Sequence, residues 1–245
     1  NEAFNAHVLR DYTPDGERLQ LPGLVSSFNP HPHQRTAVAR MISEPSVGLY
    51  HGVGAGKTAE MVMGATELRR LGLVNKPAVI VPNHMLEQVS REWLELYPQA
   101  NVLAAGSEDL RGEGRREFIA KAATGQWDGI IMTQGAFGSL DVSHAVRSDY
   151  RDRVVADYRA QLESLQDSGG RSMTTKRMEA AIERLEERMD AKLDMKKDPG
   201  LTFEQTGIDY LLVDELHDYK NLRIVSSIRD AAHDGSLRAI DLDMK

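Results

Sequence analysis

Several features that mark other protein classes are absent from this sequence of 245 residues. It contains no cysteine, which excludes disulfide bonds and thiolate metal sites. Its apolar runs, such as AVIV at residues 78–81, have the length of a strand and are far too short to cross a bilayer. No signal-type apolar segment stands near its first residues. These absences favour an intracellular, cytoplasmic protein.

A surplus of basic residues is also lacking. The formal net charge is −7 and the pI about 5.6, which argues against a uniformly basic surface for nucleic acid but is compatible with a local basic groove. A chain of this length can form one large domain or two small ones. Because it starts with Asn1 rather than methionine, we expect it to be a processed or excised piece of a longer protein.

Strand and helix patterns alternate along most of the chain. The expected strands are residues 47–50, 77–82, 101–105, 128–133 and 209–215. The expected helices are residues 33–42, 57–72, 85–97 and 114–124. Alternation of this kind predicts the α/β class, with a mainly parallel sheet and helices on both of its faces. Residues 1–30, which hold scattered Pro, Gly and Asn, are expected to form a loosely structured lead-in.

The alternation is interrupted before the last expected strand. Apolar residues at helical spacing mark two amphipathic helices, separated by DSGG at residues 167–170: Val154, Val155, Tyr158, Leu162 and Leu165, then Met178, Ile182, Leu185, Met189 and Leu193. We expect residues 146–205 to form a helical insertion in a domain built from residues 31–145 and 206–245. Acidic and basic residues are balanced in the insertion, which favours a structural hairpin over an arm that contacts DNA or a partner domain, and both readings stay open.

Residues 50–58, YHGVGAGKT, have the composition of a phosphate-binding loop. Glycines let backbone N–H groups approach a polyphosphate, and the helix that follows adds the positive end of its dipole. In such a loop, Lys57 neutralises the β- and γ-phosphates and the Thr58 hydroxyl binds Mg²⁺. The expected ATP-binding residues are Gly54, Ala55, Gly56, Lys57 and Thr58. The alternative is a flexible glycine turn with a lysine beside it by chance.

A second motif, LLVDELHD at residues 211–218, places acidic residues directly after a buried strand. Ligands of parallel α/β sheets bind at the carboxyl ends of the strands. We therefore expect Asp214 to hold Mg²⁺, and Glu215 to orient and deprotonate an attacking water. The alternative is a surface Asp-Glu pair. Together with the upstream loop, the motif indicates a P-loop nucleoside triphosphatase.

The two motifs resemble those of one branch of these enzymes. HGVGAGKT resembles motif I of superfamily 2 helicases and translocases, and DELH resembles their DEAD/DEAH-type motif II. Residues 79–93 resemble motif Ia of the Swi/Snf-type translocases, residues 129–137 the motif Ib region, and residues 29–41 the upstream glutamine motif. The resemblance implies a RecA-like motor domain that uses ATP and Mg²⁺ to move on nucleic acid, and its Swi/Snf-like motifs favour double-stranded DNA. It also favours a bacterial or phage-type host.

The resemblance implies roles for single residues. Gln34 matches the glutamine that reads adenine, and a side-chain amide has the donor and acceptor that complement adenine N7 and its 6-amino group. The alternative is a surface glutamine at the start of a helix, and the adjacent His33 is interpreted as a capping or packing residue. His217 matches the position that relays between the nucleotide site and the next motif, or else it is a loop histidine. His51 stands where most phosphate loops have a glycine, a departure that the family tolerates.

Three further residues match positions at which the family contacts the nucleic-acid backbone. Pro82, Asn83 and Thr133 stand at the ends of expected strands, on one edge of the sheet. Contacts to phosphate and sugar position a protein on nucleic acid without reading its sequence.

Two features of the family are not found in the sequence. Nothing in residues 222–245 matches the Ser-Ala-Thr motif III. There is also no room for a second RecA-like domain, the partner whose arginine finger is worth roughly 10³-fold or more in rate. We therefore expect this chain to be the first RecA-like motor domain of a larger protein, incomplete at its C-terminus. On its own it is expected to bind ATP–Mg²⁺ weakly and to hydrolyse it poorly. The alternative functions are a P-loop phosphotransferase and a nucleotide-binding module that does not hydrolyse ATP.

Overall fold

Four parallel strands form a single sheet in the computed structural model. The structure describes residues 10–167, 202–220, 222 and 236–245, together with the single residues 180, 183 and 187. The strands are β1 (Pro77–Val81), β2 (Val102–Ala105), β3 (Gly129–Thr133) and β4 (Tyr210–Val213). Their order in the sheet is β2-β3-β1-β4, and all three neighbouring pairs are parallel. The predicted α/β fold with a parallel sheet and flanking helices is confirmed.

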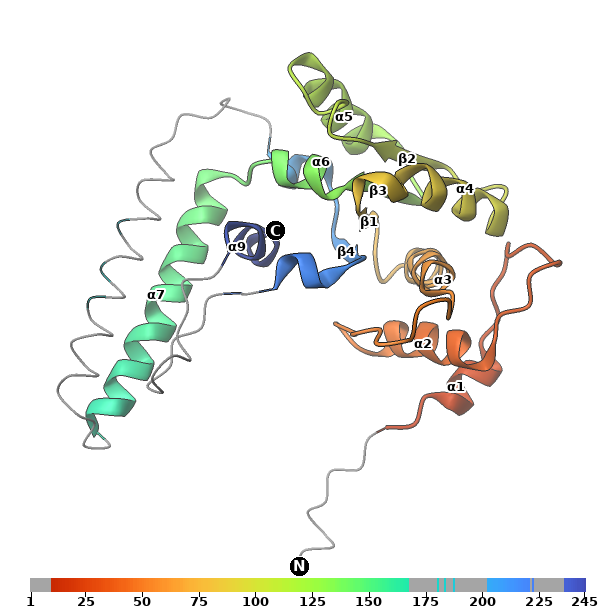
Figure 1. Ribbon diagram of the computed structural model, residues 1–245, viewed down its shortest axis with the longest axis horizontal. Helices are drawn as coiled ribbons and strands as arrows, with labels where there is room; N and C mark the ends of the chain where they lie inside the picture. Colours follow the sequence, from red (N-terminus) through yellow and green to blue (C-terminus); the bar gives the residue numbers. More distant parts are fainter. Residues whose placement is uncertain are drawn as a thin grey trace, which may run out of the picture.

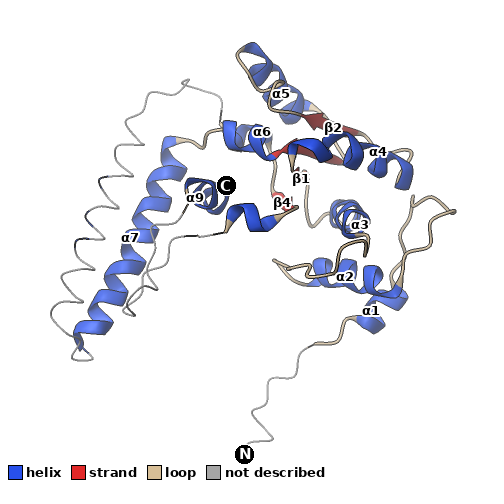
Figure 2. Ribbon diagram, in the orientation of Figure 1, coloured by secondary structure: helices blue, strands red, loops and turns tan. Residues whose placement is uncertain are grey.

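Helices surround this sheet (Figure 1, Figure 2). The α-helices are α1 (Thr13–Arg18), α2 (Pro32–Ser43), α3 (Lys57–Arg70), α4 (Leu86–Leu96), α5 (Glu113–Thr124), α6 (Gln134–Ser139), α7 (His144–Asp167) and α9 (Leu237–Met244). The short 3₁₀ helices are η2 (Asn83–Met85), η3 (Phe203–Thr206) and η4 (Leu216–Tyr219). The four helices predicted at residues 33–42, 57–72, 85–97 and 114–124 are present as α2, α3, α4 and α5. Gly72, with φ of +70°, ends α3 in the left-handed conformation that is common after helices.

The sheet lies between two layers of helices because β1, one of its two inner strands, is apolar on both faces. Ala78 and Ile80 of β1 face a core shared with α5, α6 and η3. Val79 and Val81 face a second core, shared with α2, α3 and α4. Successive side chains of a strand point to opposite faces, so one apolar strand contributes to both cores. Figure 1 shows α5 and α6 on one side of the sheet, and α2 and α3 on the other.

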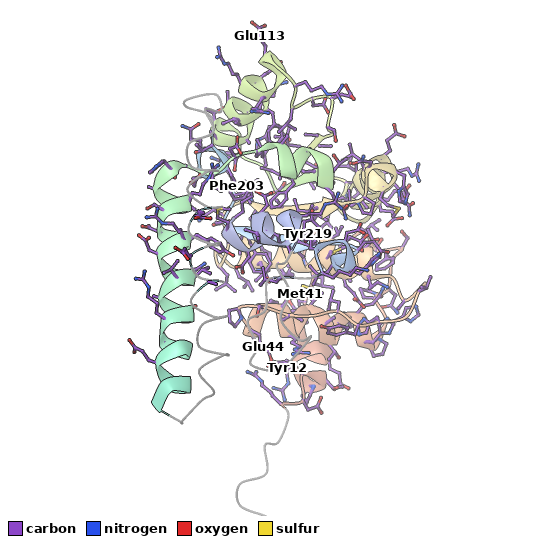
Figure 3. The ribbon with its side chains drawn as sticks, turned by 60° about the vertical axis from the view of Figure 1, so that its left-hand side comes forward. Tyr12, Met41, Glu44, Glu113, Phe203 and Tyr219 are labelled. Carbon is purple, nitrogen blue, oxygen red and sulfur yellow. The ribbon has the colours of Figure 1, made fainter. Side chains whose placement is uncertain are left out.

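Of the lead-in predicted at residues 1–30, residues 1–9 lie outside the described part of the chain, and residues 10–30 form α1 and irregular segments that pack against the domain. α1 packs against α2, where Arg35 donates a hydrogen bond to the Gly16 carbonyl at 3.0 Å. A Cβ on Gly16 would lie 2.8 Å from the backbone of α2, so the close approach of the two helices requires glycine. The Tyr12 hydroxyl donates to the Glu44 carboxylate, which follows α2 (Figure 3). The sequence does not predict α1 because this helix of six residues is too short to show a hydrophobic period.

The strand predicted at residues 47–50 is wrong, since none is present there in the described part of the chain. Val47 and Leu49 pack against the second core while Tyr50 is 94% exposed, so the segment does have one apolar side. A strand also needs a hydrogen-bonded neighbour. A cavity of about 370 Å³ is lined by residues 45–47 together with Tyr210 and Leu211 of β4.

The first helix predicted for the insertion is confirmed as part of α7. Tyr150 and Val155 of this helix are buried, and the Tyr150 hydroxyl donates to Asp243 of α9 at 2.8 Å. The predicted second helix, from Met178 to Leu193, lies outside the described residues apart from the single residues named above. None of the described helices is both long and apolar enough to cross a membrane.

Candidate nucleotide-binding site

The glycine-rich loop at residues 51–56 leads directly into the first turn of α3. Gly54 and Gly56 both have φ of +80°, a left-handed conformation that glycine adopts without strain. α3 begins at Lys57, immediately after the second of these glycines. The first N–H groups of a helix have no partner within it, so the loop ends in backbone donors at the positive end of a helix dipole. This arrangement suits the binding of an anion.

The Lys57 ammonium is turned into the loop. Its Nζ donates to the carbonyl oxygens of His51 and Gly52, both at 3.1 Å. Hydrogen bonds between two charged groups are stronger than those to a neutral carbonyl. A bound polyphosphate would therefore replace these two bonds with stronger ones. Thr58 follows in the same turn of α3, which places a hydroxyl beside the ammonium in the sequence.

Gln34 connects α2 to this loop and is only 3% exposed. Its Oε1 accepts the His31 N–H at 2.9 Å. Its Nε2 donates to the carbonyl oxygens of Ala55 and Gly56 at 3.3 and 3.4 Å. The amino group of the amide thus supports the loop, while its oxygen accepts a hydrogen bond at the start of α2. The role of Gln34 in reading adenine stays a prediction, and it would require the amide to exchange these partners.

The acidic motif follows β4 at the carboxyl edge of the sheet. The Asp214 N–H donates to the Ile80 carbonyl at 2.8 Å, which extends the contact between β1 and β4 up to this residue. Asp214 Oδ1 accepts the Glu215 N–H at 2.9 Å. Glu215 has φ of +52°, a left-handed conformation that among the described residues is otherwise found only at glycines. That conformation costs about 1–2 kcal/mol for a residue with a side chain, so tertiary contacts must impose it.

Two side chains fix the turn that follows Asp214. His217 Nδ1 lies 2.9 Å from Glu215 Oε2, and these side chains are 67% and 51% exposed, so water reaches the carboxylate. Gln134, the first residue of α6, donates to Asp218 Oδ2 at 3.0 Å. This bond joins the end of β3 to η4. Gln134 was not among the predicted site residues, although its place directly after a strand of the sheet is the same signal that identified Asp214.

Pro82, Asn83 and Thr133 lie at the same carboxyl edge, at the ends of the neighbouring strands β1 and β3. Asn83 is exposed, whereas Thr133 is 3% exposed. Thr133 Oγ1 caps α6 by accepting the Ala136 N–H at 3.1 Å, and it lies 3.3 Å from Ser107 Oγ. Thr133 therefore has a structural use, and contact of these residues with nucleic acid stays a prediction. Ser107, which follows β2, completes the edge and was missed.

The residues predicted to bind and hydrolyse the nucleotide fall into two groups. One gathers Gln34 and residues 51–58 around the loop, and the other gathers residues 214–218 and Gln134 at the end of β4. Among the described residues, no hydrogen bond or ion pair joins the two groups. Sequence reasoning also missed Glu60, whose carboxylate is fully buried beside the loop. Its position on the apolar face of α3 is a signal that could have identified it.

Comparison with known protein families identifies a family that covers both groups of residues. The family model described as "Probable helicase domain" matches residues 41–244, a range that includes the loop, the whole sheet and the acidic motif. No curated protein sequence matches the chain. Since the matched range spans most of the 245 residues, the chain belongs to this family of helicase domains.

Proposed function

We propose that this chain is the ATP-binding motor domain of a superfamily 2 helicase or translocase of the Swi/Snf type, which couples ATP hydrolysis to movement on double-stranded DNA. The observation that carries the proposal is the loop at residues 51–56. Its two left-handed glycines lead into α3, and carbonyl groups of the loop hold the Lys57 ammonium. Membership of the helicase-domain family favours a motor over a phosphotransferase or a module without hydrolysis.

The nucleotide phosphates would bind to the backbone N–H groups at the start of α3, and Lys57 would leave its carbonyl partners for the β- and γ-phosphates. The Thr58 hydroxyl and the Asp214 carboxylate would hold Mg²⁺, because both are hard oxygen donors of the kind that this ion prefers. When bound, the ion neutralises charge on the phosphates. Binding of adenine to the Gln34 amide would compete with the support that this amide gives to the loop.

Glu215 would orient and deprotonate the attacking water. The contact at 2.9 Å between His217 and its carboxylate supports this role, because it holds the carboxylate in one orientation while leaving it exposed to water. The bond between Gln134 and Asp218 connects this turn to the end of β3. We propose that the nucleic-acid backbone lies along the same edge of the sheet, at Pro82, Asn83 and Thr133.

Nucleotide binding tests the first part of the proposal. A fluorescent ATP analogue is titrated in the presence of Mg²⁺ into the wild type, Lys57→Ala, Glu215→Gln and the control Lys121→Ala. Lys57→Ala should weaken binding by about tenfold or more, because it removes a charge-assisted bond. Lys121→Ala should bind like the wild type, because Lys121 forms a surface ion pair with Glu117 on α5. Equal affinity of Lys57→Ala and wild type would refute the nucleotide site.

Hydrolysis and nucleic-acid binding test the second part. We expect a low rate of phosphate release by the wild type, and Glu215→Gln should lower it by about 100-fold while it still binds ATP. Fluorescence anisotropy with labelled double-stranded DNA, single-stranded DNA and RNA then measures the preferred partner with and without the nucleotide. Binding to none of the three would rule out a motor on nucleic acid. A preference for RNA or single strands would replace double-stranded DNA as the substrate.

A further inference from the structure

Three side chains that take no part in the proposed reaction meet beside the glycine-rich loop at residues 51–56. They are His33 on α2, His51 at the start of the loop and Glu60 on α3. His51 Nδ1 lies 2.8 and 3.0 Å from the two carboxylate oxygens of Glu60, and His33 Nε2 lies 3.7 Å from Oε1. Their nitrogen and oxygen atoms all lie within 4.8 Å of one another. Three separate segments of the chain thus direct ligand-type atoms at one point.

The burial of Glu60 indicates that this point requires positive charge. Its side chain is 0% exposed. Within the described part of the chain, its ion-pair partners are the two imidazoles, and no lysine or arginine contacts it. A buried carboxylate is costly unless it is paired or coordinates a metal. An imidazole supplies a full charge only when it is protonated, whereas a divalent cation supplies its charge over the whole neutral pH range.

We propose that His33, His51 and Glu60 form a binding site for a divalent cation of the zinc class. Two imidazole nitrogens and one carboxylate oxygen, with a fourth position left for water, form a donor set that zinc uses in proteins. Imidazole also disfavours Mg²⁺ and Ca²⁺, which prefer oxygen donors, so this ion differs from the one proposed for the nucleotide. The proposed zinc site does not depend on the proposed ATPase function, because its three ligands are side chains that take no part in the proposed binding or hydrolysis of ATP.

The distances suit such an ion. Zinc lies about 2.0–2.2 Å from nitrogen and oxygen ligands, which places the ligand atoms of a tetrahedral site about 3.4 Å apart. The observed separations of 2.8 Å for His51 and 3.7 Å for His33 lie on either side of that value. The ligand atoms of the two imidazoles lie within 4.8 Å of each other. Rotations of the side chains that bring all three separations to about 3.4 Å would admit the ion.

The ion would also have a path from solvent and a place for its protons. His33 and His51 line a cavity of about 350 Å³ between α2 and the segment at residues 47–51, and their side chains are 44% and 33% exposed. His33 Nε2 now donates to the Ala55 carbonyl at 3.0 Å. On binding, that proton moves to Nδ1 of the same ring, and the proton that His51 shares with Glu60 moves to His51 Nε2 or to solvent.

A bound ion would tie together the start of α2, the start of the loop and the first turn of α3. We therefore expect it to stabilise the fold rather than to take part in catalysis. At saturating Zn²⁺ the melting temperature of the wild type should rise by about 5 °C or more, as expected for a ligand that binds only the folded state. Mg²⁺ at the same concentration should not produce this rise.

Metal binding to the purified chain tests the proposal directly. After treatment with a chelator, the wild type is titrated with Zn²⁺ against a chromogenic chelator, and with Co²⁺, whose visible absorption reports tetrahedral coordination. His33→Asn and His51→Asn should each lower the affinity for Zn²⁺ by about 10- to 100-fold or more. His84→Asn is the matched control, because His84 is an exposed histidine on η2, and it should bind like the wild type.

Glu60→Gln should also lose the ion, and circular dichroism checks that this buried variant has folded. If it has not, His33→Asn decides the question, because the half-exposed ring can be replaced without disturbing the core. The proposal is overturned if the wild type does not bind one equivalent of Zn²⁺, which would leave the cluster as an ion pair. It is equally overturned if His33→Asn and His84→Asn bind Zn²⁺ alike.

Discussion

Replacing Gly56 with alanine should destabilise the protein more than the same change at Gly54, although both glycines have φ of +80°. The left-handed conformation alone costs alanine about 1–2 kcal/mol at either position. A Cβ at Gly54 would meet no other atom within 4 Å, so strain is its whole expected cost. A Cβ at Gly56 would lie 2.3 Å from Gln34 Nε2, and the amide must move to admit it.

Moving the Gln34 Nε2 breaks its hydrogen bonds to the carbonyl oxygens of Ala55 and Gly56, and leaves this amino group of a 3% exposed residue without those partners. A buried polar group without a partner costs about 1–3 kcal/mol. The free energy of unfolding should therefore fall by roughly 1–2 kcal/mol in Gly54→Ala. In Gly56→Ala it should fall by roughly 2–5 kcal/mol, the sum of the strain and the broken contacts.

Equilibrium unfolding in urea measures both variants, and Gln34→Ala completes a double-mutant cycle. Once the amide has been removed, Gly56→Ala should cost no more than Gly54→Ala, because only the strain remains. Equal losses in the two glycine variants would refute the reasoning that Gln34 supports the loop. So would a cost of Gly56→Ala that is unchanged in the Gln34→Ala background. These unfolding measurements do not require a nucleotide.

Three further predictions concern other elements. Thr133→Val should lower the free energy of unfolding by about 1 kcal/mol because α6 loses its N-cap, whereas Thr133→Ser should not, and urea unfolding compares the two. Gly129→Ala should cost about 1–3 kcal/mol because its Cβ would lie 2.1 Å from the Trp93 ring. Gly138→Ala, with open space around its Cβ, is the control, and an equal loss there would contradict this explanation. Burial raises the pKa of Tyr219 from 10.0 to about 12. Above the unfolded-state pKa, the unfolded chain releases this proton and the folded chain retains it, so the free energy of unfolding falls as the pH rises. Between neutral pH and about pH 11, Tyr219→Phe should therefore lose less stability than the wild type.

The elements that the sequence predicted correctly carry strong local patterns. β1 consists of Pro77 and the apolar run AVIV, and all five residues are buried. α4 presents Val89, Trp93 and Leu96 at helical spacing, and all three are buried. The glycine loop and Asp214 could be identified for a similar reason, because each is defined by spacing within a few residues. Local patterns of this kind do not depend on where the rest of the chain lies.

The features that the sequence did not predict depend on distant contacts. Residues 47–50 have the alternation of a strand but lack a neighbour to pair with. The engagement of Gln34 with the loop and the burial of Glu60 beside His33 also bring together segments that are more than 20 residues apart in the sequence. No residue pattern within a short window specifies such contacts. The position of Gly16 against α2 belongs to the same class.

The pairing of β4 with β1 has a consequence for the order of folding. Just before the two strands, the Asp209 carboxylate accepts the N–H of Lys76, which is 133 residues away in the sequence. Closing a loop of this length costs more chain entropy than forming the local helices, and pairings between distant segments form slowly. β4 should therefore join the sheet after β1 and β3 have paired. Because Asp214 stands where β4 ends, the acidic motif reaches its place only in this late step.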